Sequence, residues 1–360
     1  MGYYKNVLSS NNTTGAMATS DNYGALVGLC NPLLDISAEV PKELLEKYGV
    51  SLNNAILAEE KHVPLYKELI SDFPVQYIAG GAGQNSIRVA QWMLNSPGAT
   101  AYFGAIGSDA YGETLSKCVA EDGVLACYQK NSEGVPTGTC AVLVNGGERS
   151  LVANLAAANT FTPSHLESAE AKEIISRAKV FYVTGFFLTV SVDAILTLAK
   201  HSAEANKTFA INLSAPFLIQ FFGEQMKTIM PYTDIVFANE SEAAAYGEAH
   251  GYGTDLSTIA LKLAAQPKAS GTRPRVVVFT QGSDPTIVAS EGKVTTFPVE
   301  PLPRELLVDT NGAGDAFVGG FLAQLVLGKQ ISERVRAGNF AARTIIQRSG
   351  CTFPKECGFI

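Results

Sequence analysis

Short apolar runs alternate with longer segments of helical spacing along most of this chain. The apolar runs have the length of buried strands, and most of them end at a polar or glycine-bearing turn. Strands are predicted at 25–30, 101–106, 180–184, 208–212, 235–238 and 276–280, and helices at 86–94, 192–205, 240–247, 257–264 and 332–348. This alternation predicts an α/β fold in which helices cover both faces of a mainly parallel sheet.

A second pattern appears where short strand-like segments follow one another without a helix between them. These segments lie at 55–58, 75–79 and 137–144. They predict a small antiparallel lid assembled from separate insertions at about 33–40, 53–80 and 124–150. The remainder of 23–360 forms the large core, and residues 1–22, rich in Ser, Thr, Asn and Gly, are expected to be a flexible tail.

Composition and charge narrow the classes of function. The chain has 360 residues, 46% of them hydrophobic and 17% charged, as is usual for a globular enzyme. Its formal charge is 27 − 34 = −7, which disfavours nucleic acid as a partner, and no apolar run is long enough to cross a bilayer. The six scattered cysteines predict reduced thiols, so we expect a cytoplasmic chain, with the nucleus left open as a second location.

The most informative motif is the glycine-rich run from Asp309 to Asp315. An apolar stretch at 305–308 precedes it and predicts a strand, while the residues after it have helical spacing. A glycine-rich turn that opens a helix offers backbone N–H groups to a phosphate. The backbone amides of Gly312, Ala313 and Gly314 are therefore candidate anion ligands.

A carboxylate at this position would repel a phosphate if the site only held the anion. Asp315 is understandable if it takes the proton from a hydroxyl that attacks a terminal phosphoryl group, which makes the chain a kinase candidate. The alternative is a first-turn acid that is favoured only by the helix dipole. The chain contains no G-x-x-x-x-G-K-[ST] phosphate loop.

Two further segments offer contacts for a sugar. Asn31 and Asp35 follow the first predicted strand and could bind vicinal hydroxyls, although turn hydrogen bonds are the simpler explanation of such a pair. The run from Gly80 through Gly81 and Asn85 to Ser86 precedes a predicted amphipathic helix. Its small residues would allow a ligand to approach the backbone, or would form a hinge between core and lid.

The remaining candidates are residues for which an ordinary structural role is the simpler interpretation. Arg149, beside a helical or loop segment at 150–159, could neutralise a transferring phosphoryl group or could simply face solvent. Phe186 could stack on a base or belong to the core. Asn239 and Glu242 could hold Mg²⁺ through waters, or could form a helix-capping pair. Thr280 and Gly282 close a strand and would suit a phosphate, or form a generic turn.

Taken together, these motifs resemble the ribokinase-like family of carbohydrate and nucleoside kinases from about residue 25 to residue 354. The resemblance is carried by 31–37, 84–86, 137–140, 149–159, 185–191, 212–217, 239–242, 279–282 and 309–317. It implies a Rossmann-type core with a small α/β lid, acting as a monomer. It also implies Mg²⁺-dependent transfer of phosphate from ATP to the 5′-hydroxyl of adenosine, giving AMP and ADP in purine salvage.

The same resemblance assigns a role to each candidate residue. Asp315 would be the base, the amides from Gly312 to Gly314 would form the anion hole, and Arg149 would assist with phosphate. The ribose and its surroundings would contact Asn31, Asp35, Gly80, Gly81, Asn85 and Ser86, while Leu151, Ala153 and Phe186 would border the adenine. Asn239 and Glu242 would organise Mg²⁺, and Thr280, Gly282 and Asn311 would touch ATP.

Two other functions fit the same residues. One is a kinase of this family for another nucleoside or a free sugar, because its base and sugar contacts would be the same. The other is a non-catalytic nucleotide-binding regulator, against which an intact Asp315 argues. One residue departs from the family pattern: members often carry a hydroxyl residue where this chain has Gly83, which predicts altered rigidity next to Asn85.

Overall fold

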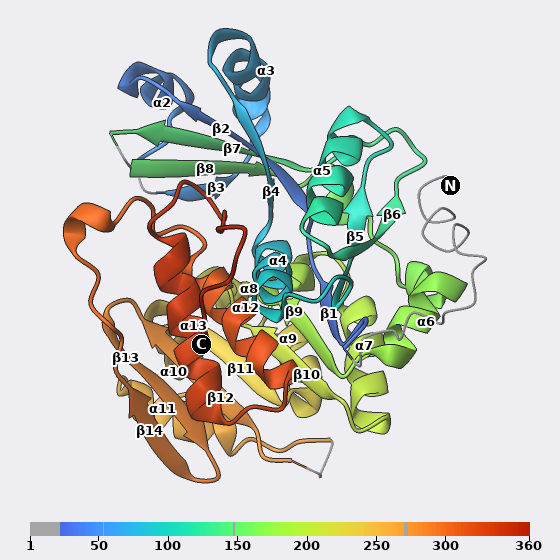
Figure 1. Cartoon of the computed structure of the whole chain (residues 1–360), viewed down its shortest axis with the longest axis vertical. Coiled ribbons are helices and arrows are strands. Elements are labelled where there is room, and N and C mark those ends of the chain that lie inside the picture. Colours follow the sequence, from blue (N-terminus) through green and yellow to red (C-terminus); the bar gives the residue numbers. More distant parts are fainter. Residues whose placement is uncertain (1–21, 53, 147, 270–272) are drawn as a thin grey trace.

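The chain folds around two sheets, a large one below and a small one above (Figure 1). The structure is a computed structural model that describes residues 22–52, 54–146, 148–269 and 273–360. All but the last residue of the predicted tail therefore lie outside the described residues. Within the described ranges, no helix is both long and apolar enough to cross a membrane.

The large sheet has nine strands within the described residues. In spatial order they are β14 (Lys293–Phe297), β13 (Asp284–Ser290), β12 (Val276–Gln281), β11 (Ile235–Asn239), β10 (Thr208–Asn212), β9 (Val180–Thr184), β1 (Leu26–Leu29), β5 (Thr100–Ile106) and β6 (Leu125–Lys130). The strands from β12 to β6 are parallel, and β13 and β14 add an antiparallel edge. The predicted mainly parallel sheet is thus confirmed, with all six predicted strands in it.

Helices cover both faces of this sheet. They are α4 (Ala82–Leu94), α5 (Ala110–Glu121), α6 (Ala169–Arg177), α7 (Val192–Glu204), α8 (Pro216–Phe221), α9 (Gly223–Ile229), α10 (Glu240–Ala249), α11 (Leu256–Ala264), α12 (Ala313–Val326) and α13 (Ile331–Ile345). The chain runs from β9 to β12 in one direction along the sheet and from β1 to β6 in the other. Because such crossovers are right-handed, the two series of helices lie on opposite faces, and the reversal between β1 and β9 is where a ligand crevice is expected.

The small sheet is mixed, whereas an antiparallel lid was predicted. Its order is β3 (Ala55–Leu57), β8 (Glu148–Asn154), β7 (Thr139–Asn145), β2 (Leu33–Glu39) and β4 (Gln76–Gly80), and the pairs β2–β7 and β3–β8 are parallel. Helices α2 (Lys42–Tyr48) and α3 (Val63–Asp72) pack on it around a separate core cluster that includes Ile36, Leu65 and Val152. The small sheet with these helices is called the lid below.

Three predictions about local structure were wrong. The lid range 124–150 begins too early, because β6 pairs with β5 in the large sheet. The segment 150–159 was predicted to be helix or loop, but its first half, up to Asn154, belongs to strand β8, and only the second half is a loop residue and a 3₁₀ helix at Ala156–Thr160. The segment 305–308 is no strand: Leu306 to Val308 are 43–47% exposed, and the N–H groups of Val308 and Asp309 donate to Ile346 O. A short apolar run does not by itself say whether a neighbouring strand exists.

Helix α4 was predicted to be amphipathic but is buried on every side from Gly83 to Met93. It starts at Ala82, four residues before the predicted start, and lies between the sheet and helix α12. Figure 1 shows α4, α12 and α13 together on the near face of the large sheet. Helix α12 therefore has neighbours on two sides, and its sequence must fit both.

Two adjacent glycines make this fit possible. A Cβ on Gly319 would lie 2.5 Å from Ser86 O of α4, and a Cβ on Gly320 would lie 2.4 Å from Ala337 O of α13. Both contacts are with backbone atoms, which cannot rotate away as a side chain can. The approach of α4 and α13 to α12 therefore depends on the absence of these two Cβ atoms.

We expect Gly320→Ala to lower the free energy of unfolding by about 1–3 kcal/mol, because α13 must move to admit the methyl group. Gly223→Ala is the control: Gly223 is the first residue of helix α9, and a Cβ there meets no atom within 4 Å. The control should stay within about 0.5 kcal/mol of the wild type in urea denaturation. Equal stability of the two variants would contradict the packing described here.

Candidate active site

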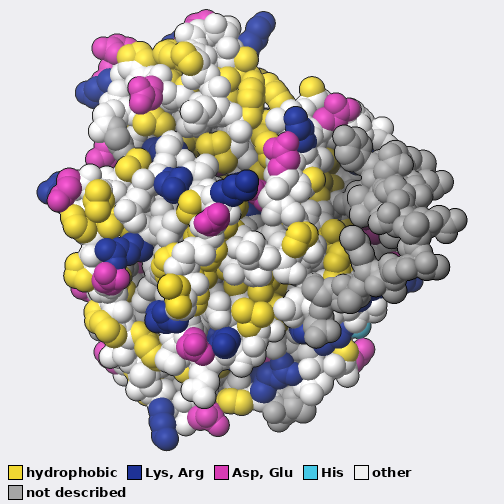
Figure 2. Space-filling view, in the orientation of Figure 1, with side chains coloured by type: hydrophobic (Ala, Val, Ile, Leu, Met, Phe, Trp, Pro, Cys, Tyr) yellow, Lys and Arg dark blue, Asp and Glu magenta, His cyan; other side chains and the backbone are white. Residues whose placement is uncertain are grey.

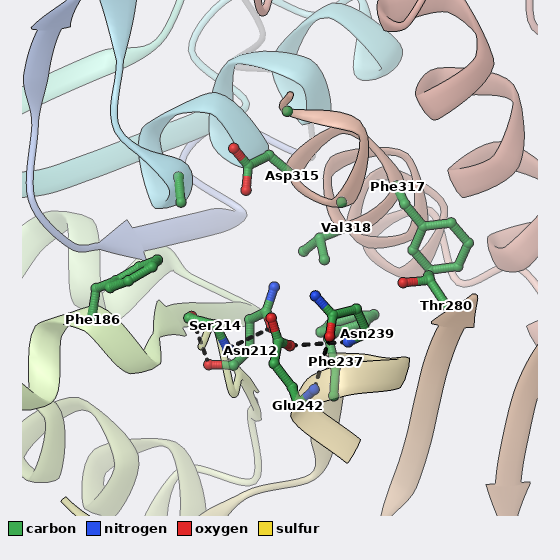
Figure 3. A pocket seen from close by; sticks show the side chains of 14 residues that line it. Phe186, Asn212, Ser214, Phe237, Asn239, Glu242, Thr280, Asp315, Phe317 and Val318 are labelled. Atoms are coloured by element: carbon green, nitrogen blue, oxygen red, sulfur yellow. Dashed lines mark hydrogen bonds between the residues drawn. The ribbon is translucent and has the colours of Figure 1, made fainter. Parts of the chain in front are cut away.

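A pocket opens at the carboxyl ends of strands β9 to β12 and beneath the start of α12. It is lined by Ala82, Phe186, Asn212, Ser214, Phe237, Ala238, Asn239, Glu242, Thr280, Gly312, Gly314, Asp315, Phe317 and Val318. Figure 3 shows Asp315 on one wall, Asn239 and Glu242 on the facing wall, and Phe186 and Thr280 at opposite ends. Seven of the predicted site residues thus meet in one cavity.

Asp315 lies in the first turn of α12, as predicted. Its Oδ2 accepts a hydrogen bond from Asn85 Nδ2 at 3.1 Å, so α4 and α12 meet at this carboxylate. Burial raises the pKa of Asp315 to about 7, the Asn85 hydrogen bond lowers it, and the negative charge of Glu242 raises it. A carboxylate with a pKa near neutrality accepts a proton more readily than an ordinary aspartate.

Two of the three residues of the predicted anion hole line the pocket. Gly312 has a φ of 78°, which a residue with a side chain rarely adopts, and it caps α12 next to Gly314 on the pocket wall. The N–H of Ala313 donates instead to Thr310 O at 3.2 Å, and Ala313 does not line the pocket. Gly312 and Gly314 thus line the pocket and Ala313 does not, and the anion contacts of all three stay predictions.

Arg149 lies on lid strand β8 and does not line the pocket. Its Nε lies 3.0 Å from Asp309 Oδ2, its Nη2 donates to Ser349 Oγ, and both members of the ion pair are almost fully buried. Asp309 also accepts hydrogen bonds from Gly350 N and from the backbone and side chain of Asn311. Arg149 therefore ties the lid to the loop before α12, and its predicted phosphate contact requires this ion pair to open.

Asn311 and Gly282 also lie outside the pocket lining. The side chain of Asn311 is held by Asp309, as described above. Gly282, with a φ of 59°, lies in the turn between β12 and β13. Their predicted contacts with ATP remain predictions, whereas Thr280, the third residue of that group, lines the pocket.

The predicted sugar contacts gather on the other side of Asp315, where the lid joins the core. Asp35 is on β2, and its carboxyl covers Gly80, on which a Cβ would lie 2.1 Å from Asp35 Oδ1. Gly81 has a φ of 89°, and a Cβ there would lie 2.3 Å from Asn31 O. These glycines allow β2, β4 and the start of α4 to come together at a single point.

The polar groups at this junction include two without a partner. Asn31 Oδ1 and Asn85 Oδ1 are buried and accept no hydrogen bond from the described residues. Burial also raises the pKa of Asp35 to about 7, which the charges of Arg88 and Arg149 oppose. Unpaired buried oxygens next to a carboxyl group suit a ligand that carries several hydroxyl groups.

Ser86, Leu151 and Ala153 are placed differently from Asn31 and Asp35. The hydroxyl of Ser86 donates to Ala82 O, one turn back in α4, and the side chain is fully buried. A direct contact between Ser86 and a substrate is therefore not favoured. Leu151 and Ala153 lie two residues apart on β8 and pack with Leu33 and Cys140 of the lid.

Asn239 and Glu242 form the capping box that was the simpler of their two interpretations. Asn239 Oδ1 accepts from Glu242 N, and Glu242 Oε2 accepts from Asn239 N, both at 2.9 Å. Burial nevertheless raises the pKa of Glu242 to about 7, and both side chains line the pocket. The cap thus holds a carboxylate and an amide in fixed positions on the wall facing Asp315.

No role was predicted from the sequence for Asn212 and Ser214, which also line the pocket. Asn212 is the last residue of β10, and Ser214 lies in the turn that follows. The signal that singled out Asn31 and Thr280, a polar residue at the carboxyl end of a parallel strand, applies equally to Asn212. The apolar lining by Phe317 and Val318 could not be separated from core packing by pattern alone.

The structure explains why Gly83 is compatible with this site. A Cβ on Gly83 would lie 2.6 Å from Cys30 Cβ and 3.4 Å from the Tyr102 hydroxyl. Cys30 fills the space between β1 and α4, and its thiol is hydrogen bonded to Thr184. A hydroxyl residue at position 83 would make this segment more rigid. In this chain the packing of Cys30 against Gly83 takes that role.

Comparison with known proteins agrees with this architecture. The sequence profile of the pfkB family of carbohydrate kinases matches residues 42–357. Adenosine kinase 1 of Arabidopsis thaliana is 55% identical, over 95% of this chain and 100% of its own length. The structure of Anopheles gambiae adenosine kinase in complex with P1,P4-di(adenosine-5) tetraphosphate has a TM-score of 0.87 and 52% identity, and covers 93% of this chain and 99% of its own.

A second solved structure is similar at lower identity. Adenosine kinase from Schistosoma mansoni in complex with adenosine and AMP has a TM-score of 0.84 and 36% identity, and covers 92% of this chain and 98% of its own.

The packing of Cys30 against Gly83 predicts a coupled pair of substitutions. We expect Gly83→Ser alone to lower the free energy of unfolding by about 1–3 kcal/mol, because the new Cβ overlaps Cys30. Adding Cys30→Gly removes the overlap, so the double variant should be more stable than the sum of the single effects by more than about 1 kcal/mol. Chemical denaturation of the four proteins measures this coupling, and additive effects would contradict it.

The raised pKa of Asp315 predicts how stability depends on pH. The unfolded carboxyl loses its proton near 3.8, whereas the folded one keeps it to about 7. The folded state therefore binds more protons between these values, so stability contributed by this group falls as pH rises from about 4 to about 7. The side chain is partly open to the pocket, so we expect a loss of about 1–2 kcal/mol.

Asp315→Asn cannot titrate and should escape this loss. Thermal unfolding of the ligand-free protein should therefore show the variant gaining on the wild type as pH rises from 5 to 8. A stability difference that does not change with pH would mean that Asp315 has an ordinary pKa.

Proposed function

The chain belongs to the pfkB family of carbohydrate kinases, and we infer from its site and relatives that it transfers the terminal phosphoryl group of ATP to the 5′-hydroxyl of adenosine, giving AMP and ADP. The observation that carries this inference is the position of Asp315. Its carboxyl lies where the hydroxyl-binding junction around Asp35 meets the pocket at the ends of β9 to β12. A base is required at that boundary and nowhere else.

The reaction follows from this placement. Asp315 accepts the proton of the 5′-hydroxyl as the hydroxyl oxygen forms a bond to the terminal phosphorus. The bond between that phosphorus and the oxygen bridging it to ADP breaks, and ADP leaves with the electron pair. Asn85 holds Asp315 Oδ2 in position without itself accepting the proton.

The start of α12 supplies stabilisation for the phosphate. The first N–H groups of a helix have no partner within it, and the helix dipole adds partial positive charge at the same end. Gly312 and Gly314 present this end to the pocket. We propose that Arg149 joins them when the lid closes and its ion pair with Asp309 opens, bringing a guanidinium towards the charge that develops on the phosphoryl oxygens.

We propose Asn31, Asp35 and Asn85 as ribose contacts, with Gly80 and Gly81 allowing the sugar to approach the backbone. The support is the pair of unpartnered oxygens on the two asparagines and the carboxyl of Asp35 between them. The adenine would lie between Phe186 on the core and Leu151 and Ala153 on the lid. Closure of the lid over the nucleoside would exclude water and limit hydrolysis of ATP.

A magnesium ion is also proposed. Mg²⁺ is commonly held by one or two carboxylates together with substrate phosphates and water, and does not need a cage of protein ligands. Glu242 and Asn239 fit that requirement, because the capping box fixes them on the pocket wall facing Asp315. When bound, the ion would neutralise charge on the ATP phosphates.

The biological setting is likewise a proposal. Making AMP from free adenosine would place the chain in purine salvage. All six cysteines are free, which is consistent with a reducing compartment such as the cytoplasm. We also propose a monomer that does not bind polyanions; the formal charge of −7 supports the second part, and on the face drawn in Figure 2 acidic and basic side chains are interspersed.

A coupled assay of ADP release tests the acceptor and the base together. We expect turnover with adenosine to exceed that with inosine, guanosine and ribose, and to require Mg²⁺. Asp315→Asn should lower kcat by roughly 10²–10⁴-fold, because it keeps the shape of the side chain but removes the proton acceptor. Its affinity for adenosine, measured by calorimetry, should stay within a few-fold of the wild type.

Different results would point to different errors. Preference for a free sugar would discard the adenine assignment, and near-normal turnover of Asp315→Asn would discard the base. Adenosine binding without any AMP formation in the presence of MgATP would instead identify a non-catalytic binding protein.

A further inference from the structure

The order of the strands places Asn212, which has no role in the proposed function so far, between the two proposed substrates. Phe186 follows β9 on the proposed adenosine side, and Thr280 ends β12 on the proposed ATP side. Strands β10 and β11 lie between them in the sheet. Asn212 is the last residue of β10. It therefore lies on the pocket wall between the proposed adenosine side and the proposed ATP side.

The turn after β10 fixes the orientation of the Asn212 amide. Ser214 N donates to Asn212 Oδ1 at 3.1 Å, which identifies the atom facing the turn as the oxygen, because a backbone N–H needs an acceptor. The NH₂ end is consequently directed the other way. Figure 3 shows the Asn212 side chain extending into the pocket towards the wall that carries Asp315.

The turn that sets this orientation is itself held in place. Ser214 has a φ of 69°, unusual for a residue with a side chain, and its Oγ donates to Asn212 O and accepts from Gly185 N. A Cβ on Gly185 would lie 2.6 Å from Leu213 O, so only glycine allows the β9 end to approach so closely. The amide is thus prepositioned by contacts from two strands.

An amide NH₂ group in this position is a hydrogen-bond donor facing a base and a helix N-terminus across the pocket. Such a donor suits an oxygen that carries negative charge. We propose that Asn212 Nδ2 donates a hydrogen bond to a non-bridging oxygen of the phosphoryl group as it passes from ATP to the acceptor. This proposal rests on the proposed kinase function and adds a catalytic residue on the wall opposite Gly312 and Gly314.

The two substitutions that test the proposal differ in what they keep. Asn212→Asp keeps the size of the side chain and the oxygen that accepts from Ser214 N, but replaces the donor by a charged acceptor. Asn212→Ala removes the donor without adding charge. We expect kcat to fall by roughly 10²–10³-fold in both variants, as for the loss of one preorganised donor to a developing oxyanion, with the larger loss for Asn212→Asp.

Adenosine affinity separates a phosphoryl contact from an acceptor contact. Calorimetry with adenosine alone should give a Kd within a few-fold of the wild type for both variants. Asn145→Asp is the control. The Asn145 side chain is also hydrogen bonded to the backbone, in this case by donating to Val40 O, but it lies in the lid away from the pocket. Its kcat should match the wild type.

The ratio of rates with ATP and with ATPγS gives a second readout that a purely structural role would not change. Sulfur accepts a hydrogen bond more weakly than oxygen, so removing the donor should reduce this ratio.

An unchanged ratio together with normal kcat, or a loss confined to adenosine affinity, would overturn the proposal. A wild-type chain that does not phosphorylate adenosine would refute the proposed function instead, before any variant is compared. If Asn212→Asp does not fold, Asn212→Ala carries the same comparison.

Discussion

The close packing of helix α12 against α4 is the constraint on which the site depends. A Cβ at Gly319 would lie 2.5 Å from Ser86 O, so glycine brings the two helices close enough for Asn85 to reach Asp315 at 3.1 Å. This single hydrogen bond joins the segment that approaches the sugar to the segment that approaches the phosphate. Because it ends on the base itself, a small shift between the helices would change the position and the pKa of that base together.

The electrostatics of the pocket follow from the same packing. Asp35, Asp315 and Glu242 each have a pKa raised to about 7, in every case mainly by burial. Asp315 and Glu242 line the pocket, and Asp35 lies at the adjoining junction of lid and core. Buried carboxyl groups so placed are unfavourable in the free protein and become useful only when hydroxyl groups or a cation arrive. The buried pair of Arg149 and Asp309 is the counterpart on the lid side, where it connects β8 to the loop that opens α12. The position of the lid and the geometry of the proposed anion site are therefore linked through this ion pair.

The sequence predicted the elements whose signal is local and strong. Strands 180–184 and 208–212 were predicted with the bounds that the structure shows, because each is a short run rich in apolar residues that alternates with segments of helical spacing. The segment 305–308 failed because a strand needs a partner, and these apolar residues have none beside them and remain exposed. Ser86 stays a predicted substrate contact, although in the free protein its hydroxyl donates within its own helix. β6 was assigned to the lid because pairing partners are not visible in one strand alone.

By itself, the sequence determined which chemical groups are present and in what order: a glycine turn before a carboxylate, and polar residues at the ends of apolar strands. Those features are set by covalent neighbours and by backbone preferences. Only the tertiary structure decided which of these groups meet, because Asn85 and Asp315 are 230 residues apart and their contact depends on how three helices pack. It also decided that Arg149 pairs with Asp309 and that Asn212 faces the pocket, since both depend on neighbours brought in by other strands.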